Sequence, residues 1–420
     1  MKKRIAVIGS GVAGLTCAYL LRERYDVHLY EANDYLGGHT QTTDVEIDGK
    51  TFPVNTGFIV FNDWTYPNFI KLMDQLGVAS EDSDMSFSVK CERSGLEYNG
   101  HSFDSLFAQR SNFLRPRFWF MIRDILRFNK ETRAELNAGT LSETETLGSY
   151  LERKKYSDWF RRFYIIPMGA AVWSSSEAMM MEFPLYFFVR FFNNHGMLSV
   201  DDRPQWRVIS RGSRSYVEKI QSSLSAAQIY LKTPVLGITR DADGVTITSK
   251  RGNERFDEII LACHSDQALA MLKDPSSQEQ DILSAIPYKM NDVVLHTDHS
   301  ILPVHQKAWA AWNYHIGQQD QDTVAVTYYM NRLQNFPEDG THFCVTLNKT
   351  ADIDPSKIIR QFRYAHPVFT LKGMAAQERH NEISGKNRTH YCGAYWFNGF
   401  HEDGVRSALR VTHELGVDLA

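Results

Sequence analysis

The first forty residues constrain the fold more than any other part of the chain. An apolar run at 5–8 leads directly into Gly9-Ser10-Gly11-Val12-Ala13-Gly14, and a second apolar run at 27–30 ends at Glu31. Glycines at these spacings let the chain turn tightly, let the backbone approach a diphosphate and bring the next helix close to the sheet. The N-terminus of that helix then faces the phosphates. The order strand, glycine turn, helix, strand and acid therefore predicts a dinucleotide-binding Rossmann unit.

The turn and the second strand supply the first set of predicted cofactor contacts. A carboxylate at the end of the second strand can accept hydrogen bonds from the hydroxyls of the adenosine ribose. We therefore expect contacts from Gly9, Gly11, Val12, Ala13, Gly14, Glu31 and Ala32.

A second glycine pair, Gly37-Gly38, stands where the chain leaves the second strand and is followed by His39 and Thr40. Standing alone, such a pair would indicate only a tight turn. NAD-binding Rossmann domains do not need it, whereas in flavoproteins it lets another stretch of backbone approach the diphosphate and ribityl chain. The pair therefore favours FAD over NAD, with Gly37, Gly38, His39 and Thr40 as further contacts.

Together, these motifs resemble those of the flavin-containing amine oxidase superfamily, which includes monoamine and polyamine oxidases, protoporphyrinogen oxidase and phytoene desaturases. Other segments are more similar to a bacterial branch described as predicted NAD/FAD-binding proteins, itself similar to the N-terminal region of plant cyclopropane fatty acid synthases. These segments are residues 55–62, Asn194-His195-Gly196, Gln205-Trp206-Arg207 and residues 399–404.

The resemblance implies an α/β fold with a Rossmann-like FAD-binding domain interleaved with an α+β substrate-binding domain. The FAD-binding domain is expected at 1–99, 205–287 and 366–420, and the substrate-binding domain at 100–204 and 288–365. FAD is expected to bind non-covalently.

The resemblance also implies roles for particular residues. Thr56, Gly57 and Phe58 would pass near the flavin and Val235 near the adenine, while Gly393, Ala394, Glu402, Gly404 and Val405 would complete the cofactor site. Phe400, Tyr395 and Trp396 would line the substrate site. This chain has His39 where much of the superfamily has arginine, and a histidine is largely neutral at pH 7 unless a neighbour raises its pKa. Ala394 replaces an acid, for which Glu402 is a possible substitute.

Two segments of the inserted lobe allow more than one interpretation. Residues 107–133 interleave seven basic side chains with aromatic and aliphatic ones. This pattern suits either an anionic membrane surface or a lobe helix that packs its apolar face inward. Residues 159–198 are dense in aromatic side chains and methionine, which fits an ordinary core or an apolar substrate tunnel.

Local patterns predict several elements outside the glycine turn. Alternating residues around Asp48-Gly49 predict a hairpin. Residues 66–76 predict a helix that ends at Gly77 and buries Phe69, Leu72, Met73 and Leu76. Residues 292–296, 308–313 and 323–330 predict strands in an antiparallel sheet of the substrate-binding domain.

The composition narrows the class of partner and the compartment. A net charge of −4 argues against general nucleic-acid binding. Five scattered cysteines without a Cys-x-x-Cys pair signal neither a disulfide framework nor a zinc site. The strand begins directly after Arg4, leaving no room for a signal peptide, and no apolar run is long enough to cross a bilayer. We therefore expect a cytoplasmic protein with no metal site, and peripheral contact with the inner membrane surface through residues 107–133 stays open as an alternative.

The expected activity is hydride removal from an apolar, lipid or acyl-type substrate to flavin N5, which requires little more than a C–H bond held over the ring. The sequence nominates no catalytic base. Three alternatives remain open: amine oxidation, redox-neutral double-bond isomerisation, and a non-catalytic accessory role beside a lipid-modifying enzyme.

Overall fold

The computed structural model describes residues 2–225, 228–318 and 324–420. A parallel five-stranded sheet carries the glycine turn at the end of its central strand, in the order β10-β2-β1-β14-β20. Its strands are β1 (Arg4–Ile8), β2 (Asp26–Tyr30), β10 (Ile229–Tyr230), β14 (Glu258–Leu261) and β20 (Thr389–Tyr391). Ile5 is in register with Val27 on one side and Glu258 on the other. This arrangement confirms the predicted Rossmann unit.

The two faces of this sheet are covered by different layers because successive side chains point to opposite sides. Ile5, Val7 and Ile260 pack with α1 (Val12–Leu21) and α16 (His401–Glu414) in one core. Ala6, Ile8 and Leu261 belong to a second core. Around that second core lie the antiparallel sheet β11 (Val235–Asp241), β12 (Gly244–Ser249) and β13 (Gly252–Phe256), and the helices α11 (Ser265–Met271), α12 (Ser277–Ser284), α14 (Leu371–Glu378) and α15 (His380–Ile383).

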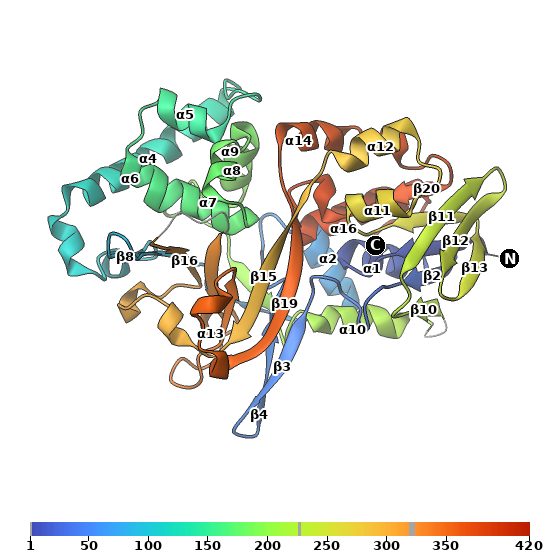
Figure 1. Cartoon of the computed structure of the whole chain (residues 1–420), viewed down its shortest axis with the longest axis horizontal. Helices are drawn as coiled ribbons and strands as arrows, with labels where there is room; N and C mark the ends of the chain where they lie inside the picture. The colour runs from blue at the N-terminus through green and yellow to red at the C-terminus, as the bar shows by residue number, and fades with distance from the viewer. Residues whose placement is uncertain (1, 226–227, 319–323) are drawn as a thin grey trace.

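A seven-stranded sheet forms the floor of the other half of the molecule (Figure 1). It is antiparallel except for the parallel pair β7–β16. In order, its strands are β19 (Ile358–Pro367), β15 (Tyr288–His296), β18 (Cys344–Leu347), β17 (Ala325–Tyr329), β16 (Trp312–Ile316), β7 (Phe87–Cys91) and β8 (Leu96–Asn99), with α13 (Met330–Leu333) after β17.

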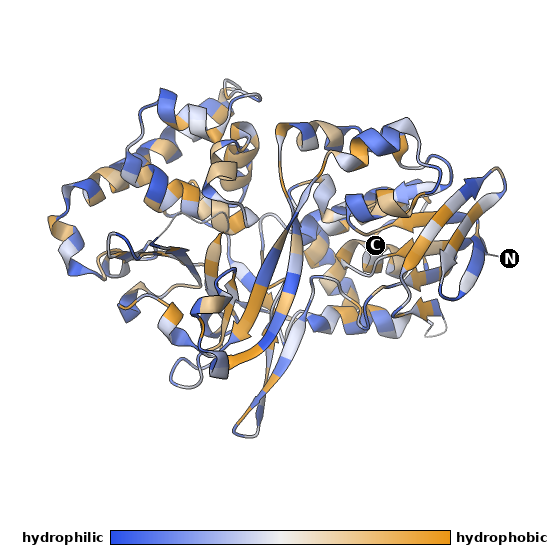
Figure 2. Cartoon of the chain, viewed as in Figure 1, coloured by the Kyte–Doolittle hydropathy of each residue, from blue (hydrophilic) through white to orange (hydrophobic). Residues whose placement is uncertain are grey.

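A helical lobe packs on this sheet and shares one aromatic-rich core with it. Its helices are α3 (Phe103–Leu106), α4 (Pro116–Asn137), α5 (Leu147–Arg153), α6 (Asp158–Phe160), α7 (Ile166–Trp173), α8 (Glu177–Met181) and α9 (Leu185–Asn194). Figure 2 shows orange and blue residues alternating along these helices, as expected for amphipathic helices around a common core.

Two local predictions near the sheet are confirmed. β3 (Thr42–Ile47) and β4 (Lys50–Asn55) form the hairpin, with φ of 49° at Asp48 and 74° at Gly49. α2 (Pro67–Leu76) ends at Gly77, whose φ of 64° is the left-handed conformation that glycine adopts most easily. A small sheet of β5 (Val60–Asn62), β9 (Trp206–Ile209) and β6 (Ser80–Asp82) flanks them, and α10 (Arg214–Ser223) follows β9.

Two local expectations differ from the structure. Residues 87–99 fall in the expected FAD-binding part, whereas β7 and β8 pair in the seven-stranded sheet through β16. This pairing joins segments more than two hundred residues apart, which local patterns do not reveal. The strand expected at 308–313 begins only at Trp312, because 306–308 form a 3-10 turn. The domain boundaries stay predictions.

Candidate active site

The three glycines of the first turn meet different surroundings. A Cβ on Gly14 would lie 1.9 Å from the Gly9 carbonyl oxygen, and one on Gly9, where φ is 101°, would lie 2.8 Å from the Ala262 oxygen. A Cβ on Gly11 would meet no protein atom within 4 Å. Gly9 and Gly14 are thus required by the packing of the protein itself, whereas Gly11 keeps open the space in front of α1.

The N-terminus of α1 faces this space without a protein cap. Among the described residues, no side chain accepts a hydrogen bond from its first turn, and that turn, which includes Ala13, contains no acidic residue. Its amides are therefore free to bind an anion, which the helix dipole also favours.

Glu31 is held in a fixed orientation at the end of β2. One carboxylate oxygen accepts from the backbone nitrogen and the hydroxyl of Ser10, at 3.0 and 2.5 Å, and the other from the backbone nitrogen and side-chain amide of Asn33, at 2.8 and 3.0 Å. The two backbone bonds fix the carboxylate, and the two side-chain donors can rotate away to admit ribose hydroxyls. Ala32 follows at the exposed end of the strand.

The second glycine pair lies directly against the first turn. The Gly37 nitrogen donates to the Ser10 oxygen at 3.0 Å, and a Cβ on Gly38 would lie 3.1 Å from the Cα of Gly11. Both glycines have positive φ, 116° and 58°. The structure thus brings together the two glycine motifs that the sequence singled out.

The segment after the hairpin packs on this pair. A Cβ on Gly57 would lie 1.9 Å from the His39 carbonyl oxygen, which accepts from the Phe58 nitrogen at 2.9 Å. The Thr56 nitrogen likewise donates to the Gln41 carbonyl oxygen at 2.9 Å. The Phe58 ring stacks on the His401 ring with centroids 3.5 Å apart.

A polar cluster links three distant segments beside Phe58. Thr40 Oγ1 lies 2.5 Å from the Tyr216 hydroxyl and 2.9 Å from His401 Nε2. Burial lowers the pKa of His401 to about 3, so its ring is neutral at pH 7. The sequence predicted a role for Thr40 but missed Tyr216 and His401. His401 lies within the motif at 399–404, and Tyr216 follows the motif at 205–207, which were the sequence signals that could have found them.

The C-terminal segment completes the arrangement. Gly393 has a φ of 153°, and a Cβ there would lie 2.5 Å from the Tyr395 ring. A Cβ on Gly404 would meet the Val12 side chain at 2.5 Å, so α16 packs closely on the start of α1, with Val405 buried beside it. Val235 is buried at the start of β11, in the core that also contains Ile8.

Comparison with known families decides the class of this site. A model of the family described as flavin containing amine oxidoreductase matches residues 12–415. The chain belongs to this family. It is therefore a flavoprotein of the oxidoreductase class, and its dinucleotide is FAD, bound non-covalently.

Short stretches also match curated proteins. The chain is 38% identical over 80 residues to a carotenoid phi-ring synthase from Chlorobaculum tepidum, covering 19% of this chain and 12% of that protein. It is 32% identical over 109 residues to a 1-hydroxycarotenoid 3,4-desaturase from a Flavobacterium species, covering 25% and 20%. The matched stretches thus span a fifth or less of these relatives.

Solved structures resemble the flavoprotein over its whole length. A cyclohexylamine oxidase from Brevibacterium oxydans IH-35A superposes with a TM-score of 0.70 at 16% identity, covering 99% of this chain and 100% of that one. A fatty acid isomerase from P. acnes that produces CLA gives 0.68 at 16% identity, covering 98% of each chain. At this identity the likenesses establish the fold alone.

The residues present fit FAD. The open space at Gly11 and the uncapped amides of α1 suit a diphosphate, and Glu31 suits the ribose. The Tyr395 hydroxyl is buried and has no hydrogen-bond partner within the described part of the chain, so it is free to contact a bound group.

Three histidines gather where the sequence lacks an arginine. The His39 ring lies 5.5 Å from that of His366, 6.0 Å from that of His264 and 5.0 Å from that of Tyr364. Burial, followed by repulsion from His366, His264 and His401, lowers the pKa of His39 well below its usual value. Burial likewise lowers the pKa of His366 to about 4. Without an anion nearby, these rings are neutral at pH 7.

We expect FAD to bind this flavoprotein more tightly as the pH falls from 8 to 6. The diphosphate would raise the pKa of a neighbouring imidazole, so binding takes up a proton, with a slope of up to about tenfold in Kd per pH unit. Titration of the apoprotein at several pH values measures the slope. His39→Arg carries a permanent charge and should flatten it, and an equal slope in that variant would contradict this assignment.

Two predicted contacts have other partners in the structure. The Glu402 carboxylate accepts from the Asn68 side chain at 2.6 Å and from the Phe69 nitrogen at 2.9 Å, which caps α2. Its role as a substitute for the missing acid at Ala394 stays a prediction. Phe400 packs on both the lobe core and the core beside α1, whereas Trp396, only 1% exposed, packs edge-on to His380 in the second core. The role of Trp396 in the substrate site stays a prediction. Tyr395 shares that core, although its hydroxyl remains available.

Asp403 is an acid in α16 that the sequence did not single out. Its carboxylate accepts from the Phe400 nitrogen at 2.9 Å and from the Asn398 side chain at 3.3 Å, which caps the helix. Burial raises its pKa to about 7 despite these hydrogen bonds.

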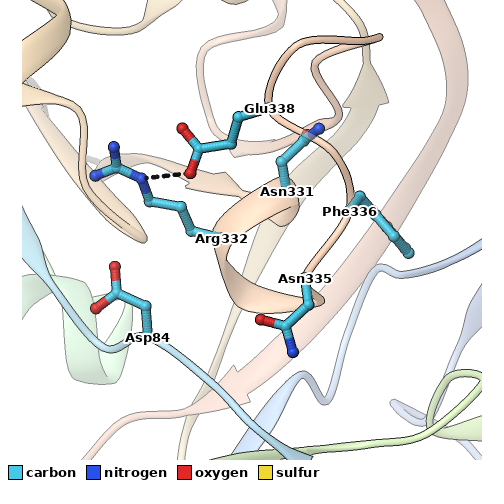
Figure 3. A pocket seen from close by; sticks show the side chains of 6 residues that line it. All are labelled: Asp84, Asn331, Arg332, Asn335, Phe336 and Glu338. Atoms are coloured by element: carbon cyan, nitrogen blue, oxygen red, sulfur yellow. Dashed lines mark hydrogen bonds and ion pairs between the residues drawn. The ribbon is translucent and has the colours of Figure 1, made fainter.

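A shallow polar pocket lies elsewhere on the flavoprotein (Figure 3). Its lining residues are Asp84, Asn331, Arg332, Asn335, Phe336 and Glu338, and Arg332 pairs with Glu338 at 3.1 Å. None of the predicted cofactor residues lines it, so it is separate from the FAD site.

Metal sites and membrane-spanning helices are two other features to consider. Within the described ranges, no group of three or more histidine, cysteine, aspartate or glutamate residues is placed to hold a metal ion. Nor does any helix of those ranges have the length and apolar character needed to cross a membrane.

Proposed function

We propose that this flavoprotein removes a hydride from an apolar, lipid or acyl-type substrate. When bound, FAD supplies the hydride acceptor at N5. The observation that carries the proposal is that the aromatic core of the helical lobe continues to the start of α16 through Phe400. Phe400 packs against both the lobe core and the core of the FAD-binding part.

The ring contacts of Phe400 support this proposal. Its ring stacks on Phe191 with centroids 4.9 Å apart and lies 6.1 Å from the His195 ring. Phe191 in turn packs on Trp173 at 4.9 Å. Most aromatic residues of 159–198 are fully buried as lobe core, so the proposed substrate surface is the part of this cluster next to Phe400.

The charges near the site favour this substrate class over an amine. A cationic substrate needs a carboxylate partner when it leaves water. The two acids of the first turn of α16, Glu402 and Asp403, are both engaged in capping helices. His366 and His401, whose pKa values burial lowers to about 4 and about 3, are neutral at pH 7 and offer no negative charge.

The names of similar proteins support the same class of substrate, an apolar one. The 1-hydroxycarotenoid 3,4-desaturase and the fatty acid isomerase are named for apolar substrates. The isomerase also keeps a redox-neutral reaction as the second candidate, and the cyclohexylamine oxidase keeps amine oxidation as a third.

Anaerobic mixing of the holoenzyme with fatty acids, carotenoid precursors and amines tests the proposal. We expect the visible absorbance of the oxidised flavin to bleach with a member of the first two groups, with one hydride equivalent transferred per flavin. Bleaching by amines alone would contradict the substrate class. Conversion of a lipid without bleaching would replace oxidation by isomerisation, and no response to any compound would favour the accessory role.

Phe400→Ala should raise KM for a long-chain substrate about ten- to a hundredfold, because a large apolar contact is lost. The affinity for FAD should change little. Phe397→Ala is the matched control, since Phe397 packs under Arg406 and Arg410 and not on the lobe. Steady-state kinetics on both variants measure the difference, and an equal rise in KM would count against Phe400 as a substrate contact.

A further inference from the structure

Five large apolar side chains are exposed together at the outer end of the helical lobe. They come from α3, the 3-10 helix at Arg110–Leu114 and the start of α4, which lie at the end of the lobe far from β1 and β2 (Figure 1). This outer patch consists of Phe103, Phe113, Leu114, Trp119 and Phe120. Leu114 is 86% exposed and Phe103 is 66% exposed. Clustered exposure of this kind marks an interaction surface more often than scattered exposure does.

Three rings of the outer patch pack on one buried ring. Phe113 stacks on the buried Phe107 ring with centroids 3.8 Å apart, and Phe103 lies 5.0 Å from the same ring. Trp119 lies 5.2 Å from Phe107, and its Nε1 donates to the Phe113 carbonyl at 3.0 Å. Phe107 is fully buried in the lobe core. Phe103, Phe113 and Trp119 are therefore anchored on Phe107.

Basic side chains surround the outer patch. Arg115 and Arg117 flank Pro116 at the start of α4, beside Leu114, and the Arg123 guanidinium lies 5.1 Å from the centre of the Phe120 ring. Residues 103–133 contain seven basic and three acidic residues, in a chain whose net charge is −4. Within the described residues, Arg117, Lys130 and Arg133 form no ion pair. The charge of this end is thus opposite to that of the whole protein.

A groove continues from this basic face along α4. It has a volume of about 530 Å³ and is lined by Leu126, Lys130, Arg133, Leu198 and Val200, among others. Leu126 and Val200 are both more than half exposed. Apolar walls with two unpaired cations at the rim suit a molecule with an acyl chain and an anionic headgroup.

We propose that the outer patch docks this protein on an anionic lipid surface. Phe113, Leu114 and Phe120 enter the interface between headgroups and acyl chains, while Arg115, Arg117 and Arg123 meet the phosphates. The attachment is peripheral. The proposal rests on this surface alone and holds whether or not the substrate is a lipid.

Flotation of the FAD-loaded full chain with vesicles tests the proposal. We expect binding to vesicles of equal parts phosphatidylcholine and phosphatidylglycerol, and weak binding to phosphatidylcholine alone. Raising the salt from about 0.1 M to about 1 M should release the protein, since the screening length falls from about 10 to about 3 Å. Arg115→Gln with Arg117→Gln should weaken binding about fivefold per charge, and Leu114→Ser with Phe120→Ser at least tenfold.

A matched control distinguishes specific docking from non-specific adsorption to vesicles. Leu236→Ser removes a side chain that is 59% exposed on β11, in the other half of the molecule, and should leave vesicle binding unchanged. Flavin content and thermal melting confirm that each variant is folded. Absence of binding to the anionic vesicles, or equal binding by all variants, would overturn the proposal. So would concentration-dependent dimerisation that Leu114→Ser with Phe120→Ser abolishes, because the patch would then join two copies of the chain.

Discussion

Gly11→Val is expected to yield a folded protein that no longer binds FAD. A Cβ at Gly11 would meet no atom of the described residues within 4 Å, and the backbone there, with φ of −63° and ψ of 177°, accommodates a β-branched residue. The added methyl groups occupy the space through which the diphosphate reaches the amides of α1. Loss of two charge-assisted hydrogen bonds weakens binding about a hundred- to ten-thousandfold.

Two other glycines serve as controls for this result. Gly100→Val also adds a side chain in open space, at the end of β8, and should bind FAD like the wild type. Gly14→Val should fail to fold, because its Cβ would lie 1.9 Å from the Gly9 carbonyl oxygen. FAD titration and circular dichroism distinguish the three variants. A yellow Gly11→Val protein with normal FAD affinity would show that the diphosphate binds elsewhere.

Arg240→Met is expected to destabilise the fold by about 3–5 kcal/mol, because it leaves a buried carboxylate without its counter-charge. Arg240 on β11 forms two hydrogen bonds to Glu279 of α12, at 2.5 and 2.9 Å, and the two side chains are 3% and 1% exposed. The Tyr391 hydroxyl of β20 donates to the same carboxylate at 2.6 Å. This cluster joins the five-stranded sheet to the layer that carries Val235.

The same cluster makes the stability of the folded state depend on pH. Burial opposes ionisation of Glu279, but hydrogen bonds from Arg240 and Tyr391 hold its pKa at about 2. A depressed pKa stabilises the folded state above the unfolded value of about 4.5, and this stabilisation is lost as the pH falls toward 2. Urea unfolding between pH 7 and pH 3 measures both the destabilisation by Arg240→Met and the loss of stability at low pH. Arg255→Met breaks the exposed pair with Asp241 and should change little, so equal losses in the two variants would contradict the assigned role of burial.

The sequence predicted the parts of the site in which local chain geometry alone dictates the residue. Glycines that need positive φ or close backbone approach, such as Gly9 and Gly38, are visible as motifs because no other residue fits. The hairpin turn at Gly49 and the helix stop at Gly77 were predictable for the same reason.

The rest depends on contacts between segments far apart in the chain. His39 looked only like a missing arginine, and the neighbouring His264 and His366 come from the end of β14 and from β19. The contact of Glu402 with α2 joins residues more than three hundred positions apart, so the sequence did not reveal it. The pairing of β7 was not predictable because its partner β16 follows more than two hundred residues later.

We infer that the site recognises both ends of FAD, from the ribose at Glu31 to the segment around Phe58 and His401. Calorimetric titration of the apoprotein with FAD, FMN and NAD tests this most directly. We expect FAD to bind one to one, and FMN at least about a hundredfold more weakly because it lacks the half that Glu31 and the first glycine turn hold. NAD, which lacks the flavin, should bind no better than FMN. Equal affinity for FAD and FMN, or tighter binding of NAD, would contradict it.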